Sequence, residues 1–559
     1  MLRSAAAVLW RRPDAAALRL LIQALGLAVF GVYLETALEA IGSRVPREVF
    51  QESSFTWALL QQRPVFWLPA LFALGLGAWS FTAEGSRRLG WERFDTVGGL
   101  RWVVFAIMIT LGWPYGAHPY NHYYDQAHLL DRALVFAFML LSLRSPVWIP
   151  FFGLQVAISR AQTFLSVHMV TPIVDEVPFR ILCAVAGFGL WNLASAELRS
   201  LREGVRLGGL RLRAAPIETH VLVFSVLCLF GSYYVYAGVG KVGVGIEPLD
   251  WVRYSHMDNL FIGAWLNGWN AGLPEAKALE IAGWLRRLSI PIAAATLAVE
   301  VGMLFVLAQW WVTVLLLASV VAMHLAIMSL TGVFFWTWTL IAGGWLVWLL
   351  WQRGSEGLKR LHSPVNAVLS FALTGALAAV FGWDPFAWWN SKWNTMLELD
   401  AVDRAGNVYR VDYSDFSPYL LVSFWEPYGP SYPGWYGGTP LQTVMQRLET
   451  VEPEKLKSGN DARWAAGQGP VERDPALDEF IQRFFRNRNR NLDRNILALP
   501  PPPTIRMRDP RGGGAPYRGQ APVVEVRVRY VEKYYTGSSI YPLRDTLVHT
   551  IPIPAGGSP

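Results

Sequence analysis

Residues 221–241 read VLVFSVLCLFGSYYVYAGVGK, an apolar run that closes on glycines and a lysine, Lys241. The run has the ~20 apolar residues that a helix needs to cross the hydrocarbon core of a bilayer. An ammonium group inside a span costs about 3 kcal/mol at the span centre and less toward the interface. We therefore expect a transmembrane helix here, with a lysine at or near its edge that is a candidate functional residue.

Lys241 has two interpretations at the level of sequence. Desolvation disfavours the charged form of an amine, so a lysine beside lipid can act as a base near neutral pH. Alternatively, its aliphatic stem lies along lipid while its head reaches water. The fragment GVGK at 238–241 is not a phosphate-binding loop, because it lacks the upstream glycine spacing and no Ser or Thr follows the lysine.

Composition places the whole chain among polytopic membrane proteins. Of its 559 residues, 53% are hydrophobic and only 16% are charged, against roughly 25% charged residues in soluble domains. The net charge of +7 does not indicate nucleic-acid binding, because many arginines lie in short loops between apolar stretches. Stretches near the length of a span recur about eleven times, at 17–40, 66–82, 97–113, 127–143, 148–167, 179–193, 219–237, 290–307, 312–329, 334–350 and 365–381.

Loop charges predict the orientation of these spans. With the N-terminus in the cytoplasm, the loop 115–128 falls outside and holds no Lys or Arg, as the positive-inside rule expects. The exceptions on the outer side are Arg286 and Arg287, beside the eighth span, and Arg44, Arg47 and Arg63, in the first outer loop. We expect an integral protein of a bacterial inner membrane, with Lys241 and the C-terminal region on the extracytoplasmic face. The inner loops then hold the basic clusters at 87–93, 144, 199–213 and 353–360.

The C-terminal region is a different kind of sequence. A turn at 403–407 between two apolar segments predicts a hairpin, and alternation at 524–530 predicts a half-exposed strand. The segments 441–450 and 477–485 favour helices. The chain is thus predicted to be an all-α polytopic membrane domain of roughly eleven transmembrane helices at 1–383. A small, loop-rich, β-containing extramembrane domain follows at 384–559.

Other polar features can also carry chemistry. The outer loop Tyr120-Asn121-His122-Tyr123-Tyr124-Asp125 is either an interfacial aromatic belt or a cluster that holds a substrate oxygen. Glu300 and His324 interrupt apolar runs, where ionisable residues usually face the bundle interior and find a partner. A histidine in such a place is often an interhelical hydrogen-bond donor. His118 and His122 have a helical spacing, but Pro119 disfavours a helix and no ligand set is complete, so no metal is expected.

Taken together, these motifs resemble the vitamin K-dependent γ-carboxylase family and its wider bacterial relatives, the horizontally transferred transmembrane (HTTM) domain proteins. The strongest likeness is Tyr236-Ala237-Gly238-Val239-Gly240-Lys241, followed by Asp250-Trp251-Val252. It is similar to the family's Ala-Gly-Val-x-Lys followed by Asp-Trp-Val. Asn121-His122-Tyr123-Tyr124 resembles the family's Asn-His motif, and Arg12-Pro13-Asp14-Ala15 its opening before the first span. The resemblance covers about 12–350.

The resemblance implies a membrane-bound quinol oxygenase with a set of site residues. Lys241 would deprotonate vitamin K hydroquinone or a menaquinol-type quinol. His122, with Asn121, would hydrogen-bond the quinone or peroxide oxygen, and His324 would support that pocket as a third catalytic residue. Glu300 falls where the family keeps an acidic residue and would have a supporting role. Two aromatic residues of the main motif would contact the substrate, namely Tyr236 and Trp251.

The resemblance also implies the reaction's other components. O2 would convert the quinol to an epoxide, and the strong base so formed would allow a glutamyl side chain of a protein or peptide to capture CO2. A separate quinone reductase would be required, because the only cysteines, Cys183 and Cys228, lie in apolar segments. We expect no metal cofactor and no nucleic-acid partner. The quinol would arrive through the membrane lipid.

Two departures bear on this implied function. Carboxylases of the family carry two adjacent lysines, whereas the residue before Lys241 is Gly240. The tail after Phe381 shows no likeness to the carboxylase's peptide-binding portion, so quinol chemistry is implied more directly than protein carboxylation. Two other functions also fit the sequence. One is a transporter or lipid-handling protein that uses Lys241 and Glu300; the other is a non-catalytic membrane scaffold whose tail binds a partner.

Overall fold

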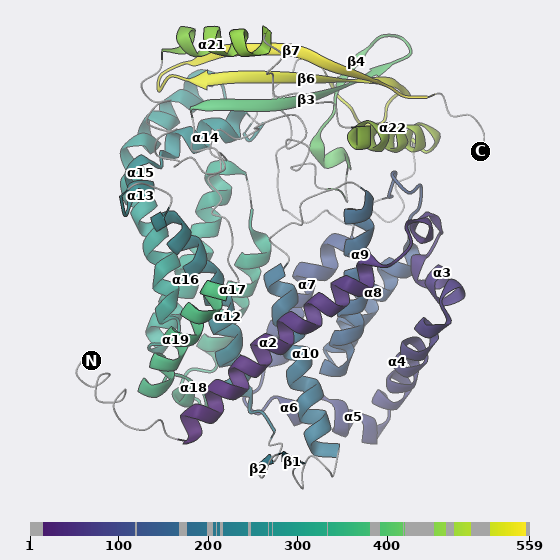
Figure 1. The fold of residues 1–559 in the computed structure, drawn as a ribbon, viewed down its shortest axis with the longest axis vertical. Helices are drawn as coiled ribbons and strands as arrows, with labels where there is room; N and C mark the ends of the chain where they lie inside the picture. The colour runs from purple at the N-terminus through teal and green to yellow at the C-terminus, as the bar shows by residue number, and fades with distance from the viewer. Residues whose placement is uncertain are drawn as a thin grey trace.

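Helices make up most of this protein, and a small sheet caps one end of them (Figure 1). The computed structural model describes the greater part of the chain. The described residues are 15–117, 120–166, 176–197, 205–207, 210–212, 216–243, 247–266, 268–270, 272–332, 334–380, 392–416, 419, 452–465, 475–492 and 515–554.

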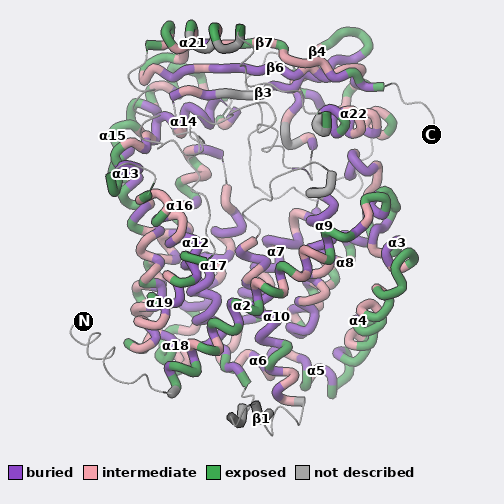
Figure 2. Tube along the Cα trace, viewed as in Figure 1, coloured by how far each residue is buried: buried purple, intermediate pink, exposed green. Residues whose placement is uncertain are grey.

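The helical part has two groups of helices that meet along α12 (Thr219–Gly243). One group consists of α2 (Ala15–Ser43), α7 (Leu100–Gly116), α8 (Leu129–Ser142), α9 (Ile149–Ser166) and α10 (Glu176–Glu197). The other consists of α15 (Glu275–Gly302), α16 (Trp310–Thr331), α17 (Trp336–Trp351) and α19 (Pro364–Val380). Because α12 packs on α2 and α10 as well as on α15 and α19, nearly all of it is buried (Figure 2). An all-round apolar sequence is what such a central helix requires.

Each of the eleven apolar stretches overlaps a helix within the described residues, although several extend beyond it. Within the described residues, five helices are long and apolar enough to cross a membrane, namely α2, α10, α12, α15 and α16. A sixth candidate is a pair broken by a bend of 109°, in which α4 (Trp67–Ser80) is followed by α5 (Ala83–Leu89). The helices α7 and α19 are apolar but shorter.

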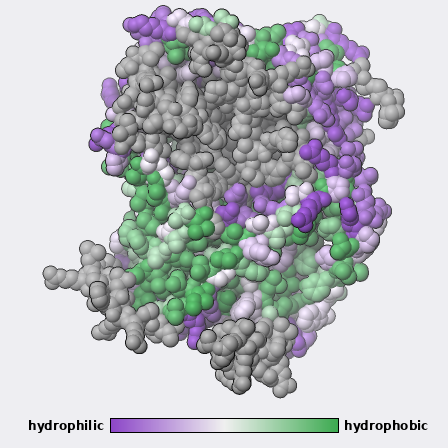
Figure 3. Space-filling view, viewed as in Figure 1, coloured by the Kyte–Doolittle hydropathy of each residue, from purple (hydrophilic) through white to green (hydrophobic). Residues whose placement is uncertain are grey.

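The outer face of the helical part is apolar. Figure 3 shows hydrophobic residues spread over its surface, with hydrophilic residues gathered around the sheet. On α4, for example, Leu68 is 70% exposed, Phe72 is 62% exposed and Leu74 is 69% exposed. Large apolar side chains exposed side by side mark a surface that contacts something other than water. This surface is compatible with a bilayer around the helices.

The C-terminal sheet has the strand order β5-β4-β3-β6-β7. The long strands β3 (Trp393–Asp403), β6 (Val523–Tyr535) and β7 (Ile540–Pro552) pair antiparallel, with Leu399 opposite Val528. The short β4 (Val408–Arg410) continues β3 through a turn, and β5 (Ala515–Pro516) adds a parallel edge. The predicted hairpin and strand are both confirmed.

Local chemistry forms the predicted turn between β3 and β4. The Asp403 carboxylate accepts hydrogen bonds from the backbone amides of Ala405 and Asn407 at 2.8 and 2.9 Å. Gly406 has φ +83°, which glycine adopts without steric cost. Two helices flank the sheet, α21 (Pro453–Ala465) and α22 (Pro475–Arg490), and α22 contains the predicted helix at 477–485. The helix predicted at 441–450 lies outside the described residues.

The basic segments lie at the end of the bundle opposite the sheet. Figure 1 places α5, the hairpin β1–β2 (Val205–Leu207 and Leu210–Leu212) and α18 (Glu356–Leu361) together there. Arg286, an exception to the sequence pattern, lies in the first half of α15, against the C-terminal domain. Its Nη1 is 2.9 Å from where a Cβ at Gly537 would be. The first turns of α15 therefore contact the sheet.

Candidate functional site

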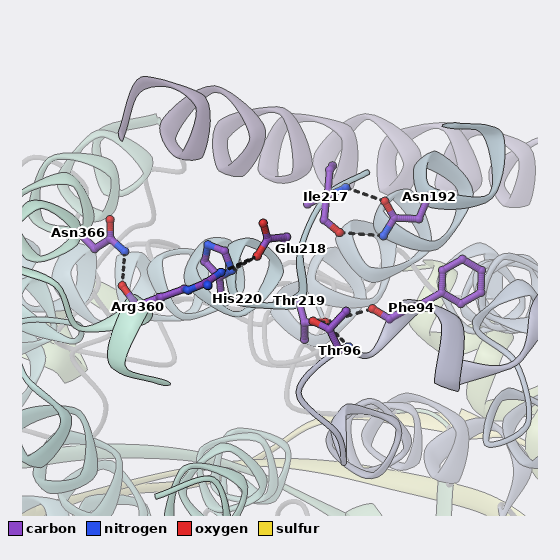
Figure 4. Close-up of polar contacts among 9 residues, drawn as sticks. All are labelled: Phe94, Thr96, Asn192, Ile217, Glu218, Thr219, His220, Arg360 and Asn366. Atoms are coloured by element: carbon purple, nitrogen blue, oxygen red, sulfur yellow. Dashed lines mark hydrogen bonds and ion pairs between the residues drawn. The ribbon is translucent and has the colours of Figure 1, made fainter. Parts of the chain in front are cut away.

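The start of α12 is fixed by hydrogen bonds to α10 and to the segment 94–96, and Glu218 just before the helix pairs with Arg360 of α18 (Figure 4). The Thr219 hydroxyl donates to the carbonyl of Phe94 at 3.1 Å and accepts from the amide of Thr96 at 2.9 Å. Just before the helix, the side chain of Asn192 makes two hydrogen bonds with the backbone of Ile217, at 2.7 and 2.9 Å. These contacts fix the register of α12 and therefore the position of residues at its other end.

Lys241 lies in the last turn of α12 and forms an ion pair with Glu300 of α15. Its Nζ is 2.5 Å from Glu300 Oε1, and the two side chains are only 15% and 7% exposed. The ammonium also lies 5.3 Å from the ring centroid of Trp251, which belongs to α13 (Asp250–Tyr254). The second carboxylate oxygen, Glu300 Oε2, is buried, and no described residue hydrogen-bonds to it. The pair is therefore a largely desolvated site with one unused acceptor.

Gly238 allows α12 and α15 to approach closely at this pair. A Cβ at position 238 would lie 2.9 Å from Val301 Cγ2 and 3.1 Å from Glu300 Cβ. Contacts that short require the neighbouring atoms to move, so a side chain here would push the helices apart. The close approach of the two helices therefore explains why a glycine stands at position 238, three residues before Lys241.

A second polar pair lies on α12 two turns below Lys241. The hydroxyl of Tyr234 is 2.7 Å from Nε2 of His324, which lies in α16. Both side chains are buried, and they are enclosed by aromatic rings, with Trp338 5.2 Å from the Tyr234 centroid and Phe335 5.3 Å from the His324 centroid. His324 Nδ1 is buried and has no hydrogen-bond partner. The charge of Lys241 acts on His324, and that of Glu300 acts on Tyr234, so the two pairs are electrostatic neighbours.

His122 lies in the loop between α7 and α8, against the C-terminal domain. Its ring packs edge-on against Phe484 of α22 at 5.4 Å and against Tyr120 at 5.2 Å. The side-chain amide of Asn487 donates to the His122 carbonyl at 2.8 Å. Burial, and secondarily the charge of Arg488, lower the pKa of His122 to about 4. The imidazole is therefore neutral at pH 7.

Asn121 holds the same loop to the C-terminal domain. It is fully buried, and its Oδ1 accepts hydrogen bonds from the Tyr419 hydroxyl at 3.0 Å and from the Tyr124 amide at 3.2 Å. The backbones of Asn121 and Gln126 pair with each other and close the loop. Asn121 thus organises the loop that carries His122, and its Nδ2 has no hydrogen-bond partner.

The structure groups the predicted site residues into two separate places. Lys241 pairs with Glu300 and lies near Trp251, and His324 pairs with Tyr234, two turns away on the same helix α12. Tyr236, on the same helix, is partly buried. Within the described residues, no hydrogen bond, ion pair or ring contact joins Lys241 to the second place, the loop with Asn121 and His122. That loop contacts Phe484 and Asn487 of α22, and Tyr419, in the C-terminal region.

Sequence reasoning missed a third polar cluster inside the bundle. Arg180 of α10 forms ion pairs with Glu35 of α2 and Glu176, and it contacts the hydroxyl of Tyr233. The signal was present, because Glu35 and Arg180 interrupt predicted spans in the same way as Glu300 does.

The described residues contain no group of three or more His, Cys, Asp or Glu side chains that could hold a metal ion. Cys183 and Cys228 are buried free thiols in α10 and α12. Comparison with models of protein families, with curated proteins and with solved structures finds no match to this chain.

Proposed function

We propose that this chain is a membrane-bound, quinol-dependent oxygenase similar to the vitamin K-dependent γ-carboxylases, with its proton-accepting site at Lys241 and Glu300. The observation that carries the proposal is the desolvated ion pair at the end of α12, with its unused buried oxygen. Charged groups at such depth are costly and usually functional. A lipid-soluble quinol needs its base near the hydrocarbon, and this pair lies on two apolar helices.

The pair acts as a unit in accepting the quinol proton. An ammonium and a carboxylate in contact have no net charge, and they can take up one proton between them. Glu300 can take the proton of Lys241 across their hydrogen bond, which leaves a neutral amine to deprotonate the quinol hydroxyl. The products are a phenolate and a pair with one net positive charge. That charge stabilises the phenolate, because attraction is strong where water is excluded.

Tyr234 and His324 supply a second hydrogen-bonding group. When the Tyr234 hydroxyl donates to His324 Nε2, Nδ1 carries the ring proton and is free to donate. Nδ1 has no protein partner, and Lys241 and Glu300 act electrostatically on this pair of residues. An imidazole N–H placed there would steady a developing phenolate or peroxide oxygen.

The overall reaction balances with O2 as the only oxidant. A quinol and O2 yield the quinone epoxide and one water, so the quinol supplies the hydrogens of that water. Carboxylation of a glutamyl side chain by CO2 is a coupled step that the family resemblance implies. Regeneration of the quinol would fall to a separate reductase. The basic end of the bundle would face the cytoplasm, with Lys241 and the sheet domain on the outer side.

The decisive experiment incubates purified protein in lipid nanodiscs with vitamin K hydroquinone or menaquinol and O2, and detects the epoxide by mass spectrometry. We expect epoxide from the wild type and a loss of at least about 100-fold in Lys241→Met, the range of a lost general base. Gly243→Ala, in the same last turn of α12 with nothing within 4 Å of the added methyl, is the matched control and should remain active. Unchanged activity in Lys241→Met would remove the proposed base.

His122 receives a separate test because its contacts are with the C-terminal domain. If it binds a quinone oxygen, His122→Phe should lose activity although the aromatic packing on Phe484 is kept. If it only positions the loop, His122→Phe should be active, and Phe484→Ala should be the more damaging change. The ratio of the two activities assigns the role.

A further inference from the structure

A network of ionisable side chains lies on the α10 side of α12, apart from the Lys241 site. Glu35 of α2 pairs with Arg180 of α10, whose Nη2 is also 3.2 Å from Glu176 Oε2. The guanidinium of Arg180 also donates a hydrogen bond to the hydroxyl of Tyr233 on α12. One turn along α2 from Glu35, Glu39 Oε1 is 2.9 Å from Nη1 of Arg160 on α9. Four helices thus contribute to one cluster.

The cluster does not balance its charge. Among the described residues, three carboxylates, Glu35, Glu39 and Glu176, face two guanidiniums, Arg160 and Arg180, which leaves one negative charge. An unbalanced charge inside an apolar bundle is strongly unfavourable, and such a site takes up a neutralising partner instead. Two other titratable groups of the described residues lie near Glu35, the Tyr233 hydroxyl and the Cys183 thiol. Neither can carry a positive charge.

The position of the excess charge is Glu35. Its side chain is 3% exposed, against 23% for Glu176 and 43% for Glu39, so water can solvate the other two. Glu35 Oε2 accepts from Arg180, while Oε1 is buried and has no hydrogen-bond partner among the described residues. A carboxyl group with one paired oxygen and one bare oxygen has room for a single proton on the bare atom.

A proton fits this site better than a metal cation does. Metal cations such as Ca²⁺ require several oxygen ligands around one point. The described residues hold no group of three or more acidic, His or Cys side chains arranged for a metal ion. Two guanidiniums in the cluster would also repel a cation.

We propose that Glu35 is a proton-binding site within the bundle, and that its proton exchanges with water through Glu39. The two residues are four apart on α2 and therefore lie on the same face of the helix. The side chain of Glu39 is 43% exposed, so Glu39 is the residue through which the proton enters the cluster. The bound proton sits one turn away from it, held beside Arg180. This site is independent of the quinol chemistry proposed for Lys241.

Infrared spectroscopy of the full-length protein in nanodiscs tests this site. A protonated carboxyl group gives a carbonyl stretch that carboxylates lack and that shifts in D2O. We expect this band in the wild type at neutral pH and its loss in Glu35→Gln. Removing Glu39 together with its partner Arg160, as Glu39→Gln/Arg160→Gln, keeps one excess negative charge, so the band should persist there and exchange more slowly in D2O. Glu300→Gln, which removes the buried carboxyl group of the Lys241 site, is a control and should keep the band.

Several outcomes would overturn the proposal. One is a spectrum of Glu35→Gln that is identical to that of the wild type, and another is loss of the band in Glu39→Gln/Arg160→Gln, which keeps the excess charge and Glu35 itself. Stoichiometric binding of 22Na⁺ that Glu35→Gln abolishes would assign the site to a cation. Glu35→Gln should fold like the wild type, since its amide can place oxygen toward Arg180 and NH2 where the proton would be. Failure of this variant alone to fold would also contradict a protonated Glu35.

Discussion

A charged Lys241 or Glu300 alone would strongly destabilise the apolar bundle, and the contact between the two reduces that cost. The ion pair at 2.5 Å offsets part of the cost of removing each charge from water. The sequence predicted both residues as functional candidates, because each interrupts an apolar run. It could not predict that they pair, since the partner of a buried charge depends on the register between two helices that are 59 residues apart at this point.

Removing one member of this pair should cost more than removing both. We expect Glu300→Gln to lower the free energy of unfolding by about 3 kcal/mol, because it leaves the ammonium of Lys241 without its carboxylate. The double variant Lys241→Met/Glu300→Gln should regain most of that loss. Thermal unfolding of the purified variants in one detergent measures both. A double variant no more stable than Glu300→Gln would show that the pair is not coupled.

The loop that carries His122 should detach from the C-terminal domain in acid. Burial lowers the pKa of His122 to about 4, below its ordinary value of about 6.5. The unfolded or detached loop therefore binds the proton more readily, and docking weakens as the pH falls from about 6.5 to about 4. Hydrogen exchange of residues 120–126 should accelerate over this range. In His122→Phe, which keeps a ring but cannot titrate, the pH dependence should largely disappear.

At the scale of elements, α12 organises the molecule. Its apolar run predicted a helix correctly because every side of it packs against another helix. The bend between α4 and α5 was not predicted, and neither was the extension of α15 to Glu275, well before the predicted start at 290. The length of an apolar stretch predicts neither a bend within it nor a polar extension of the helix before it. The added turns of α15 carry Lys277, Arg286 and Arg287, and they contact the sheet domain instead of lying within an apolar stretch.

Gly238 should be intolerant of even one methyl group. Gly238→Ala places a Cβ 2.9 Å from Val301 Cγ2, so α12 and α15 must separate and the pair of Lys241 with Glu300 must lengthen. We expect a loss of about 1–3 kcal/mol in unfolding free energy from this overpacking, together with reduced epoxide formation. Gly243→Ala, on the same helix with open space around it, should be neutral in both measurements. Equal effects of the two substitutions would contradict the close-packing argument.

On the scale of the whole molecule, the two ends of the bundle differ in structure. The sheet domain, the His122 loop and the start of α15 gather at one end, and the basic segments gather at the other (Figure 1). The loop charges in the sequence predicted this separation, since short loops are sorted by their Lys and Arg content. The sequence did not predict that α22 docks on the His122 loop. The docking depends on the side-chain amide of Asn487 and the ring of Phe484, which are more than 350 residues from His122 in the chain.

Cysteine labelling tests the two ends directly. Ser538→Cys, in the exposed turn between β6 and β7, should react with a membrane-impermeant maleimide added to intact spheroplasts. Glu356→Cys, in the first turn of α18, should react only after the membrane is opened. The native cysteines are buried, so their background is low. Labelling of both variants, or of Glu356→Cys alone, in intact spheroplasts would contradict the proposed orientation.

The chemistry at the end of α12 is tested most directly by following oxygen itself. Wild-type protein in nanodiscs is supplied with the quinol under 18O2, and the mass of the product is compared with that from Lys241→Met and Gly243→Ala. Incorporation of one 18O atom into an epoxide by the wild type and by Gly243→Ala, and its absence in Lys241→Met, is the predicted result. Two results would contradict a quinol oxygenase centred on the pair of Lys241 with Glu300. One is that the wild type forms no labelled epoxide, and the other is that Lys241→Met forms as much labelled epoxide as the wild type.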